Sequence, residues 1–215
     1  MSVVGRNVQV RPWRCHNRLA PDGAPWIWRL RVVSAEPLIG ALGDHVPSVH
    51  PDAWVAPGAV VVGRVTLGRA SSVWYGSVLR ADDAEIVVGA ECNIQDLCCL
   101  HVDEGEPAVL EDRVSLGHHA MVHGAHIETG ALIGIGAVVL GRAHIGAGTL
   151  VAAGTVIRPG STVPAGVLAA GVPCRVVREL TDADRESFAQ TAVNYVRRAA
   201  RHRAAAWAAP GGAQV

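Results

Sequence analysis

The sequence predicts an all-β solenoid, a coil of short strands, with one helix at its C-terminal end. An aliphatic residue recurs at every sixth position over long stretches from residue 49 onward, and a small residue usually stands four positions after it. Glycine is abundant at 24 residues, and aromatic residues are scarce apart from six tryptophans. A period of six fits neither an amphipathic helix nor an array of hairpins. It is typical of solenoids, whose units stack and bury a continuous core.

The aliphatic series defines the solenoid, which we expect over residues 37–179. Each six-residue unit is predicted to form a short strand and a turn, with the aliphatic side chain inside and the small residue at the corner. The repeated positions, in order, are Val49, Val55, Val61, Leu67, Val73 and Leu79; Val88, Ile94 and Leu100; Leu110 and Leu116; and Met121, Ile127, Ile133, Val139, Ile145, Val151, Ile157 and Val163. The four residues Cys92, Cys98, Ser71 and Ser77 take small inward positions.

The two ends of the chain depart from this period. Residues 1–36 contain six arginines and two acids, so we expect a poorly ordered extension; an upstream start codon or a targeting peptide are the alternatives. At the other end, Thr181 with the acids that follow it has the pattern of a helix cap. Phe188, Tyr195 and neighbouring alanines then recur at helical spacing, which predicts a helix over residues 180–207 and a tail over 208–215.

Composition excludes several classes of protein. The formal net charge is zero, so no basic surface indicates nucleic acid as a partner. All 19 basic residues are arginine, which excludes a lysine Schiff base or a phosphate-binding lysine. Five cysteines without framework spacing favour a reducing compartment, and we expect a cytoplasmic protein. No apolar run is long enough for a membrane span.

Histidines gather where the six-residue period slips, in the stretch GHHAMVHGAHI at residues 117–127. Counted from the nearest aliphatic positions, His118 and His123 take outward or turn positions, and His101 points outward because it follows Leu100. Seventeen steps separate His101 from His118, which in a three-sided coil predicts the same side, about one layer apart. Three imidazoles around an open position are a ligand set of catalytic zinc. Solvated histidines are the alternative.

Three motifs follow one another in order: R-x-D at residues 80–82, N-x-Q-D-x4-H at 93–101 and G-H-x4-H at 117–123. Together with VWYGSVLRADDAEIVVGAECNIQDLCCLHV, LGHHAMVHGAHI and AAGVPCRVVREL, they resemble the γ-class carbonic anhydrase family of hexapeptide-repeat proteins, over roughly residues 38–200. The resemblance implies a left-handed parallel β-helix assembled as a homotrimer. It places this chain with members that have a short loop after the first histidine.

The resemblance also implies a metal site shared between subunits. His101 and His123 of one chain and His118 of its neighbour become the three ligands of Zn²⁺, with Fe²⁺ and Co²⁺ as alternatives. The implied activity is hydration of carbon dioxide to bicarbonate by a zinc-bound hydroxide at the trimer interface. His119 and His126 are interpreted as structural.

The same resemblance implies roles for polar residues around the metal. Arg80 and Asp82 are expected to form ion pairs across the subunit interface, joined by Asp96; a solvated surface pair is the alternative. Gln95 and Asn93 are expected to orient water, carbon dioxide or bicarbonate, with a ladder of stacked amides as the alternative.

Two further assignments are less direct. Tyr195 is expected close to the site, although it also fits the buried face of the helix. The longer acidic loop that carries a proton-shuttle glutamate in some members of the family is missing here. Asp83 is a candidate replacement, assisted by Glu104 or Glu106, and solvated charges are the alternative for each of the three.

Two other functions remain open at this point. Acyltransferases share the same β-helix, bind coenzyme A between coils and use one histidine as a general base. A set of three histidines is not needed there, and fold alone does not decide the function. The other alternative is a catalytically weak metal-binding trimeric scaffold, because the shuttle loop is missing.

Overall fold

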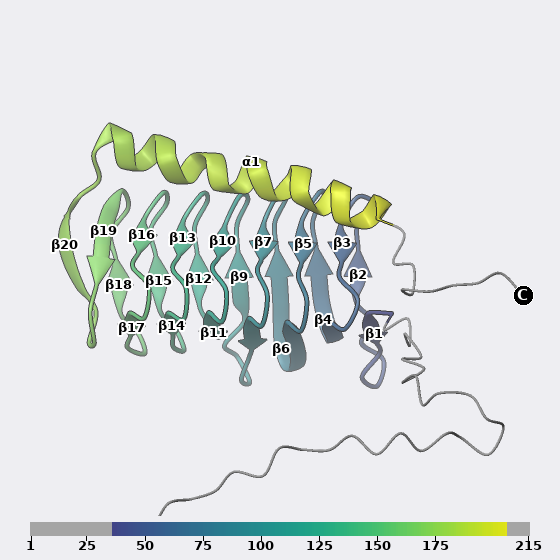
Figure 1. Ribbon diagram of the computed structural model, residues 1–215. Helices are drawn as coiled ribbons and strands as arrows, with labels where there is room; N and C mark the ends of the chain where they lie inside the picture. The colour runs from purple at the N-terminus through teal and green to yellow at the C-terminus, as the bar shows by residue number, and fades with distance from the viewer. Residues whose placement is uncertain (1–35, 206–215) are drawn as a thin grey trace, which may run out of the picture. The chain divides into compact units, whose positions relative to one another are not determined.

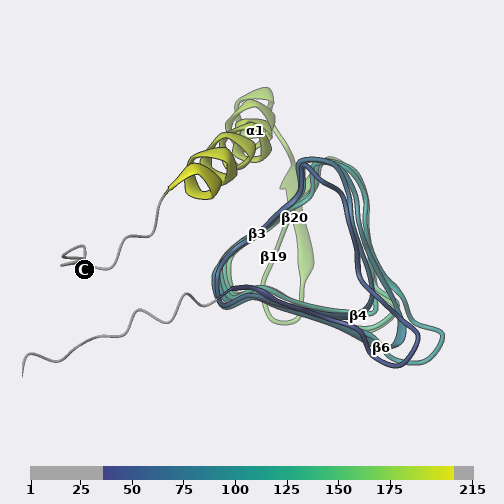
Figure 2. The same ribbon diagram turned by 90° about the vertical axis from the view of Figure 1, so that its right-hand side faces the viewer.

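The computed structural model describes residues 36–205, which form a three-sided parallel β-helix followed by one long helix (Figures 1 and 2). The first face of the β-helix is an eight-stranded sheet. Its strands are β3 (Trp54–Val55), β5 (Ser72–Val73), β7 (Asn93–Ile94), β10 (Ser115–Leu116), β13 (Leu132–Ile133), β16 (Leu150–Val151), β19 (Val167–Ala170) and β20 (Arg175–Glu179).

The second and third faces belong to one twelve-stranded sheet, because β6 bends round the corner between them and pairs with β8 on one side and β9 on the other. The second face holds β8 (Cys99–His101), β11 (Met121–His123), β14 (Val138–Val139) and β17 (Val156–Ile157). The third face holds β2 (Ser48–Val49), β9 (Ala108–Leu110), β12 (His126–Ile127), β15 (His144–Ile145) and β18 (Thr162–Val163). Strands β4 (Val60–Leu67) and β6 (Val78–Val88) span both faces, and β1 (Leu38–Gly40) pairs with β4.

The aliphatic repeat lies in the interior, as the sequence predicts. Ile94 pairs in register with Val73 on the preceding coil and Leu116 on the next, and all three side chains are fully buried. Parallel strands stacked in this way align like residues with like, so each aliphatic side chain packs on the one in the coil before it. The predicted fold class, a left-handed parallel β-helix of hexapeptide repeats with a C-terminal helix, is confirmed (Figure 2).

One position of the predicted repeat is wrong. Val122, rather than Met121, is the inward residue of β11, because it pairs with Leu100 and Val139 and is fully buried. Met121 is half-buried on the outward side. The slip in the period therefore falls after Val122, where only five steps lead to the next inward residue, Ile127. His123 consequently follows an inward residue directly, just as His101 follows Leu100.

The cysteines at the corners are structural. Cys92 and Cys98 are buried, and their thiols donate to the carbonyl oxygens of Glu111 and Gly117. Burial raises the pKa of each thiol to about 12. Both side chains are therefore protonated at neutral pH and serve as small packing groups, as their place in the repeat predicts.

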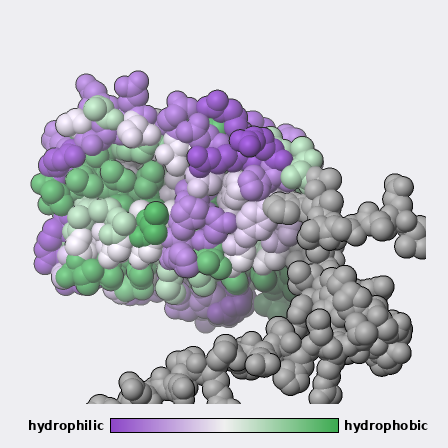
Figure 3. Space-filling view, viewed as in Figure 1, coloured by the Kyte–Doolittle hydropathy of each residue, from purple (hydrophilic) through white to green (hydrophobic). Residues whose placement is uncertain are grey.

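Helix α1 (Asp182–Ala204) runs along the β-helix and contacts β3, β5 and β7 of the first face (Figure 1). Its buried residues include Tyr195 and Ala199, which pack with Trp54 and Trp74; the ring centroids of Trp74 and Tyr195 are 5.2 Å apart. Hydrophilic side chains cover much of the helix's outer side, whereas hydrophobic side chains gather over the C-terminal coils (Figure 3). No helix within residues 36–205 is long and apolar enough to cross a membrane.

Thr181 caps α1. Its hydroxyl accepts a hydrogen bond from the backbone N–H of Asp184, whose carboxylate in turn accepts from the N–H of Thr181. We expect Thr181→Ala to lower the free energy of unfolding by about 1 kcal/mol, because a backbone N–H at the helix start loses its partner. Denaturant unfolding measures this change. Thr181→Ser keeps the hydroxyl and is the control; an equal loss in both variants would contradict the capping role.

Only some of the predicted domain boundaries fall within the residues that the structure describes. Of the expected extension over residues 1–36, all but Glu36 lies outside the described residues, and so does the expected tail over 208–215. Within the described part, regular structure begins at Leu38 and the helix ends at Ala204.

Candidate metal centre

The predicted ligands occupy both ends of the second face. His101 ends β8 and His123 ends β11, and the two residues pair in register at the corner between the second and third faces. Arg80 lies in the same column, one coil before His101. His118 instead lies in the turn between β10 and β11, at the corner between the first and second faces.

The prediction that His101 and His118 lie on the same side, one layer apart, is wrong. It assumed coils of constant length, but the coil that leads from His101 to its neighbour His123 has 22 steps because of an additional loop after His101. Seventeen steps from His101 therefore end at the corner between the first and second faces, one corner before the position of His123. Among the described residues, the group of close metal-ligating side chains that contains His101 and His123 does not include His118.

His101 and His123 have the spacing of two ligands of one metal ion. His101 Nδ1 lies 3.0 Å from His123 Nε2. Around a tetrahedral Zn²⁺ with bonds of about 2.0–2.1 Å, neighbouring nitrogen ligands are about 3.3 Å apart. Asp103 joins this pair, and one ligand atom from each of the three side chains lies within 4.8 Å of the others. The donor set is chemically suited to Zn²⁺, although this corner holds only two of the three imidazoles that the sequence predicts as ligands.

A carboxylate orients His101. Its Nε2 lies 2.9 Å from Asp82 Oδ1, the arrangement in which the ring donates its N–H and leaves Nδ1 free to face His123. Arg80 contacts the other oxygen of Asp82. Burial, with a smaller contribution from Arg80, lowers the pKa of His101. Burial and the charge of Arg80 both favour the neutral imidazole, which is the form that binds metals. A carboxylate partner such as Asp82 is common among metal-bound histidines.

His118 is oriented in the same way at its own corner. Its Nδ1 lies 2.9 Å from Asp96 Oδ2, and its Nε2 lies 3.5 Å from the hydroxyl of Tyr195. About two fifths of the His118 side chain is exposed. Burial raises the pKa of Tyr195, with a further contribution from the charge of Asp96, while Arg198 lowers it. The tyrosine therefore remains a protonated hydroxyl beside the imidazole at neutral pH.

Gln95 and Asn93 form a buried chain of amides on the first face. Gln95 Nε2 donates to Asn93 Oδ1 at 3.0 Å, and Asn93 Nδ2 donates to the hydroxyl of Ser115 at 2.7 Å. The two amides belong to the same coil, and the residues in register with Asn93 on the adjacent coils are Ser72 and Ser115, so the network is not a ladder of stacked amides. Gln95 immediately precedes Asp96, the carboxylate that contacts His118. Within one chain it therefore lies towards the corner of His118 and not towards the corner of His101 and His123.

The remaining predicted residues are exposed or make other contacts. Asp83 is exposed, and so is Glu104. His119 has a positive φ of 60° and its N–H donates to the carbonyl of Asp96, so it shapes the turn beside His118. His126 Nε2 lies 2.9 Å from Glu111 Oε1, on the third face.

The sequence interpretation did not include Asp103. A signal was present, because Asp103 stands two positions after His101, and residues two apart in a strand point to the same side. The N-x-Q-D-x4-H motif ends at His101, however, and of the acids that follow only Glu104 and Glu106 were assigned roles, as groups that assist a proton shuttle or as solvated charges.

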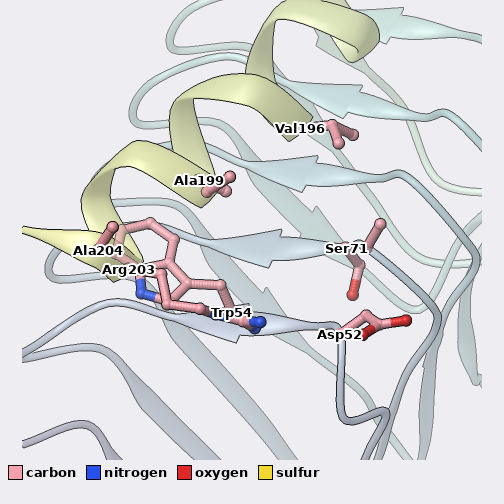
Figure 4. Close-up of a pocket in the computed structure, with 9 residues that line it drawn as sticks. Asp52, Trp54, Ser71, Val196, Ala199, Arg203 and Ala204 are labelled. Atoms are coloured by element: carbon pink, nitrogen blue, oxygen red, sulfur yellow. The ribbon is translucent and has the colours of Figure 1, made fainter.

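A pocket of about 350 Å³ lies between the end of α1 and the first coils (Figure 4). Its lining includes Asp52, Trp54, Ser71, Val196 and Arg203. The guanidinium of Arg203 donates to the carbonyl oxygen of Ala53 and so helps to attach the helix end. The pocket contains no predicted site residue, and we assign it no chemistry.

The fold defines a hexapeptide-repeat β-helix protein, and His101, His123 and Asp103 bring potential metal-ligating atoms together at one corner of it. A hexapeptide transferase family protein from Anaplasma phagocytophilum has a similar structure, with a TM-score of 0.73 at 33% identity over 77% of this chain and 98% of that one. A Methanocaldococcus jannaschii protein named "Probable carbonic anhydrase" is 51% identical over 66% of this chain and 90% of its own length. The Arabidopsis thaliana protein "Gamma carbonic anhydrase 1, mitochondrial" is 39% identical over 75% of this chain and 61% of that one.

This chain belongs to the γ-class carbonic anhydrase family. No family model matches the sequence.

Proposed function

We propose that this protein is a homotrimeric, metal-dependent enzyme that hydrates carbon dioxide to bicarbonate. In this proposal His101 and His123 of one chain and His118 of the next chain hold one Zn²⁺ ion at each subunit interface. The observation that supports it most strongly is the placement of His118, one corner away from the other two histidines yet oriented by its own carboxylate. A second copy of the chain is the natural source of the missing imidazole.

The second face supports such an assembly. Its outward side carries an apolar column, one residue per coil, in continuous register: Val78, Cys99, Met121, Val138 and Val156. Cys99 is exposed and the others are half-buried in the single chain. In this proposal the second face has His118 at one edge and His101 with His123 at the other, so two chains that share a metal site contact each other head to tail. Such contacts close into a ring of three when each chain is rotated by one third of a turn relative to the last.

The chain's own residues would prepare this site for carbon dioxide. Three imidazoles around a metal ion lower the pKa of a bound water to about 7, which supplies hydroxide at neutral pH. Asp82 and Asp96 hold the rings of His101 and His118 in the orientation needed. Gln95, fixed by Asn93, is the rigid amide that we propose positions water or carbon dioxide. Asp83, on the bend of β6, is the proposed acceptor of the released proton.

Acyl transfer is the second candidate, favoured by the name of the structural relative from Anaplasma phagocytophilum, a hexapeptide transferase family protein. A transferase of this kind would use coenzyme A and one histidine, and would depend neither on metal nor on all three histidines. A metal-binding scaffold with weak activity is the third.

One experiment separates these functions: metal analysis of the purified protein together with carbon dioxide hydration by the wild type, His118→Ala and His119→Ala. We expect one metal ion per chain and a loss in kcat/KM of more than about 100-fold in His118→Ala, since removing even an outer partner of a ligand costs 10–100-fold. His119→Ala is the control and should retain activity, because the imidazole that it removes lies beside His118 in the sequence but is not a proposed ligand.

Absence of bound metal from the wild type would overturn the proposed function. Bound metal without hydration activity would favour the scaffold. Turnover of acetyl-coenzyme A that survives both His118→Ala and metal removal would favour the transferase.

A further inference from the structure

Tyr195 has a well-defined position beside His118. Only 7% of the tyrosine is exposed, and its ring stands edge-on to Trp74 at a centroid distance of 5.2 Å. Its hydroxyl oxygen lies 3.5 Å from His118 Nε2, the ring nitrogen that Asp96 does not contact. A metal ion bound to this nitrogen would therefore have the tyrosine hydroxyl close to it.

Arg198 contacts Tyr195 from the next turn of α1. Its guanidinium carbon lies 4.9 Å from the centroid of the tyrosine ring, and the arginine side chain is exposed to solvent. Burial raises the pKa of Tyr195, whereas the charge of Arg198 and a hydrogen bond from it both lower that pKa. The arginine thus acts on the hydroxyl of the tyrosine as well as on its ring.

The donors and acceptors of these two side chains determine where the tyrosine hydrogen points. A guanidinium has five N–H donors and no acceptor, so the Tyr195 oxygen must accept in its hydrogen bond with Arg198. The hydroxyl hydrogen is then directed to another partner, and His118 Nε2 is the polar atom beside it. If a metal ion occupies that nitrogen, the hydrogen becomes available to a molecule at the open position of the metal site.

A hydrogen-bond donor at this place favours an anion over a neutral molecule. Hydrogen bonds with one ionised partner are roughly twice as strong as those between neutral groups. Bicarbonate carries a negative charge on its oxygens and carbon dioxide carries none. The positive charge of Arg198 acts in the same direction, and the nearby carboxylate of Asp96 is engaged with His118.

We propose that Arg198 is a positioning residue for bicarbonate: its guanidinium donates to the Tyr195 oxygen, and the Tyr195 hydroxyl in turn donates to bicarbonate in the site that contains His118. This inference rests on the proposed metal function and extends it to a residue of α1. Neither Arg198 nor Tyr195 is a metal ligand in this arrangement, so the position for water and bicarbonate stays open.

Titration of the Co²⁺-substituted protein with bicarbonate, followed by visible absorption, tests the proposal without an assay of turnover. We expect Arg198→Met to raise the dissociation constant for bicarbonate by about 10-fold, the order expected when a hydrogen bond to a charged group is lost. Methionine keeps an unbranched side chain against the tyrosine ring but has no N–H donor. Arg198→Lys keeps the charge and the donors, and should recover most of the affinity.

Arg197→Met is the matched control, because Arg197 is also exposed but donates to Asn194 Oδ1 at 3.0 Å. We expect less than about a threefold change in this variant, since an exposed charge contributes little. Imidazole, a neutral metal ligand, should bind the wild type and Arg198→Met equally well. Equal loss of bicarbonate affinity in both arginine variants, or a parallel loss of imidazole affinity in Arg198→Met, would overturn the inference.

Tyr195→Phe separates positioning from a direct effect of the arginine charge. It removes the hydroxyl through which Arg198 is proposed to act, so adding Arg198→Met to it should weaken bicarbonate binding no further. Losses that add fully in the double variant would show that the two residues act independently and would contradict the proposal. A wild type that binds no metal would instead overturn the proposed function as a whole, so the two failures are distinguishable.

Discussion

Mixed trimers of His101→Ala and His118→Ala chains are expected to regain activity that neither homotrimer has. Each proposed site takes His101 from one chain and His118 from the next, so a site between a His118→Ala chain and a His101→Ala chain can receive both intact. With equal amounts and random assembly, about one quarter of the sites should have all ligands. Refolding the two variants together, followed by measurement of metal content and carbon dioxide hydration, checks this result.

The matched control mixes His101→Ala with His123→Ala. Both ligands come from the same chain, because His101 and His123 pair in register at one corner. No site in these mixed trimers can therefore contain both residues, and activity should stay at the level of the separate variants. Equal recovery in the two mixtures would contradict a site shared in this way.

Replacing an inward aliphatic residue should have the largest effect on stability. Ile133 is fully buried between Leu116 and Val151 of the adjacent coils. Ile133→Ala leaves a cavity that neighbouring coils cannot fill, and we expect the free energy of unfolding to fall by about 2–5 kcal/mol. Denaturant unfolding monitored by circular dichroism measures the change.

Leu132 provides the control for this substitution, since it precedes Ile133 in the same strand but points outward and is half-buried. Leu132→Ala removes a similar apolar volume from the outer side, and we expect a loss of about 1 kcal/mol or less, typical of surface positions. A loss in Leu132→Ala equal to that in Ile133→Ala would contradict the inward and outward assignment of the repeat.

Much of the fold was predictable because one local rule is repeated. An aliphatic residue inside and a small residue at the corner suffice for each unit, and stacking aligns the units. Met121 was misplaced because a methionine and a valine stand side by side, and six-residue counting alone cannot choose between them where the period shifts. Only pairing with Leu100 and Val139 identifies Val122 as the inward residue.

The site was less predictable, because it depends on contacts between coils. Counting steps could not place His118 relative to His101, since the length of one coil is changed by the loop at residues 102–107. The hydrogen bonds of Asp82 to His101 and of Asp96 to His118 could not be read from the sequence either. The roles of these carboxylates, of Gln95 and of Tyr195 remain predictions.

Unequal coil length has a consequence for how such proteins can diversify. Leu100 and Val122 pair in register although 22 residues separate them, whereas Ile133 and Val151 pair across 18. Additional residues at a corner are thus accommodated outside the prism, without displacing the strands before and after them. Segments beside the candidate metal centre can lengthen or shorten while the imidazoles keep their positions, so access to the site and the scaffold that holds it can evolve separately.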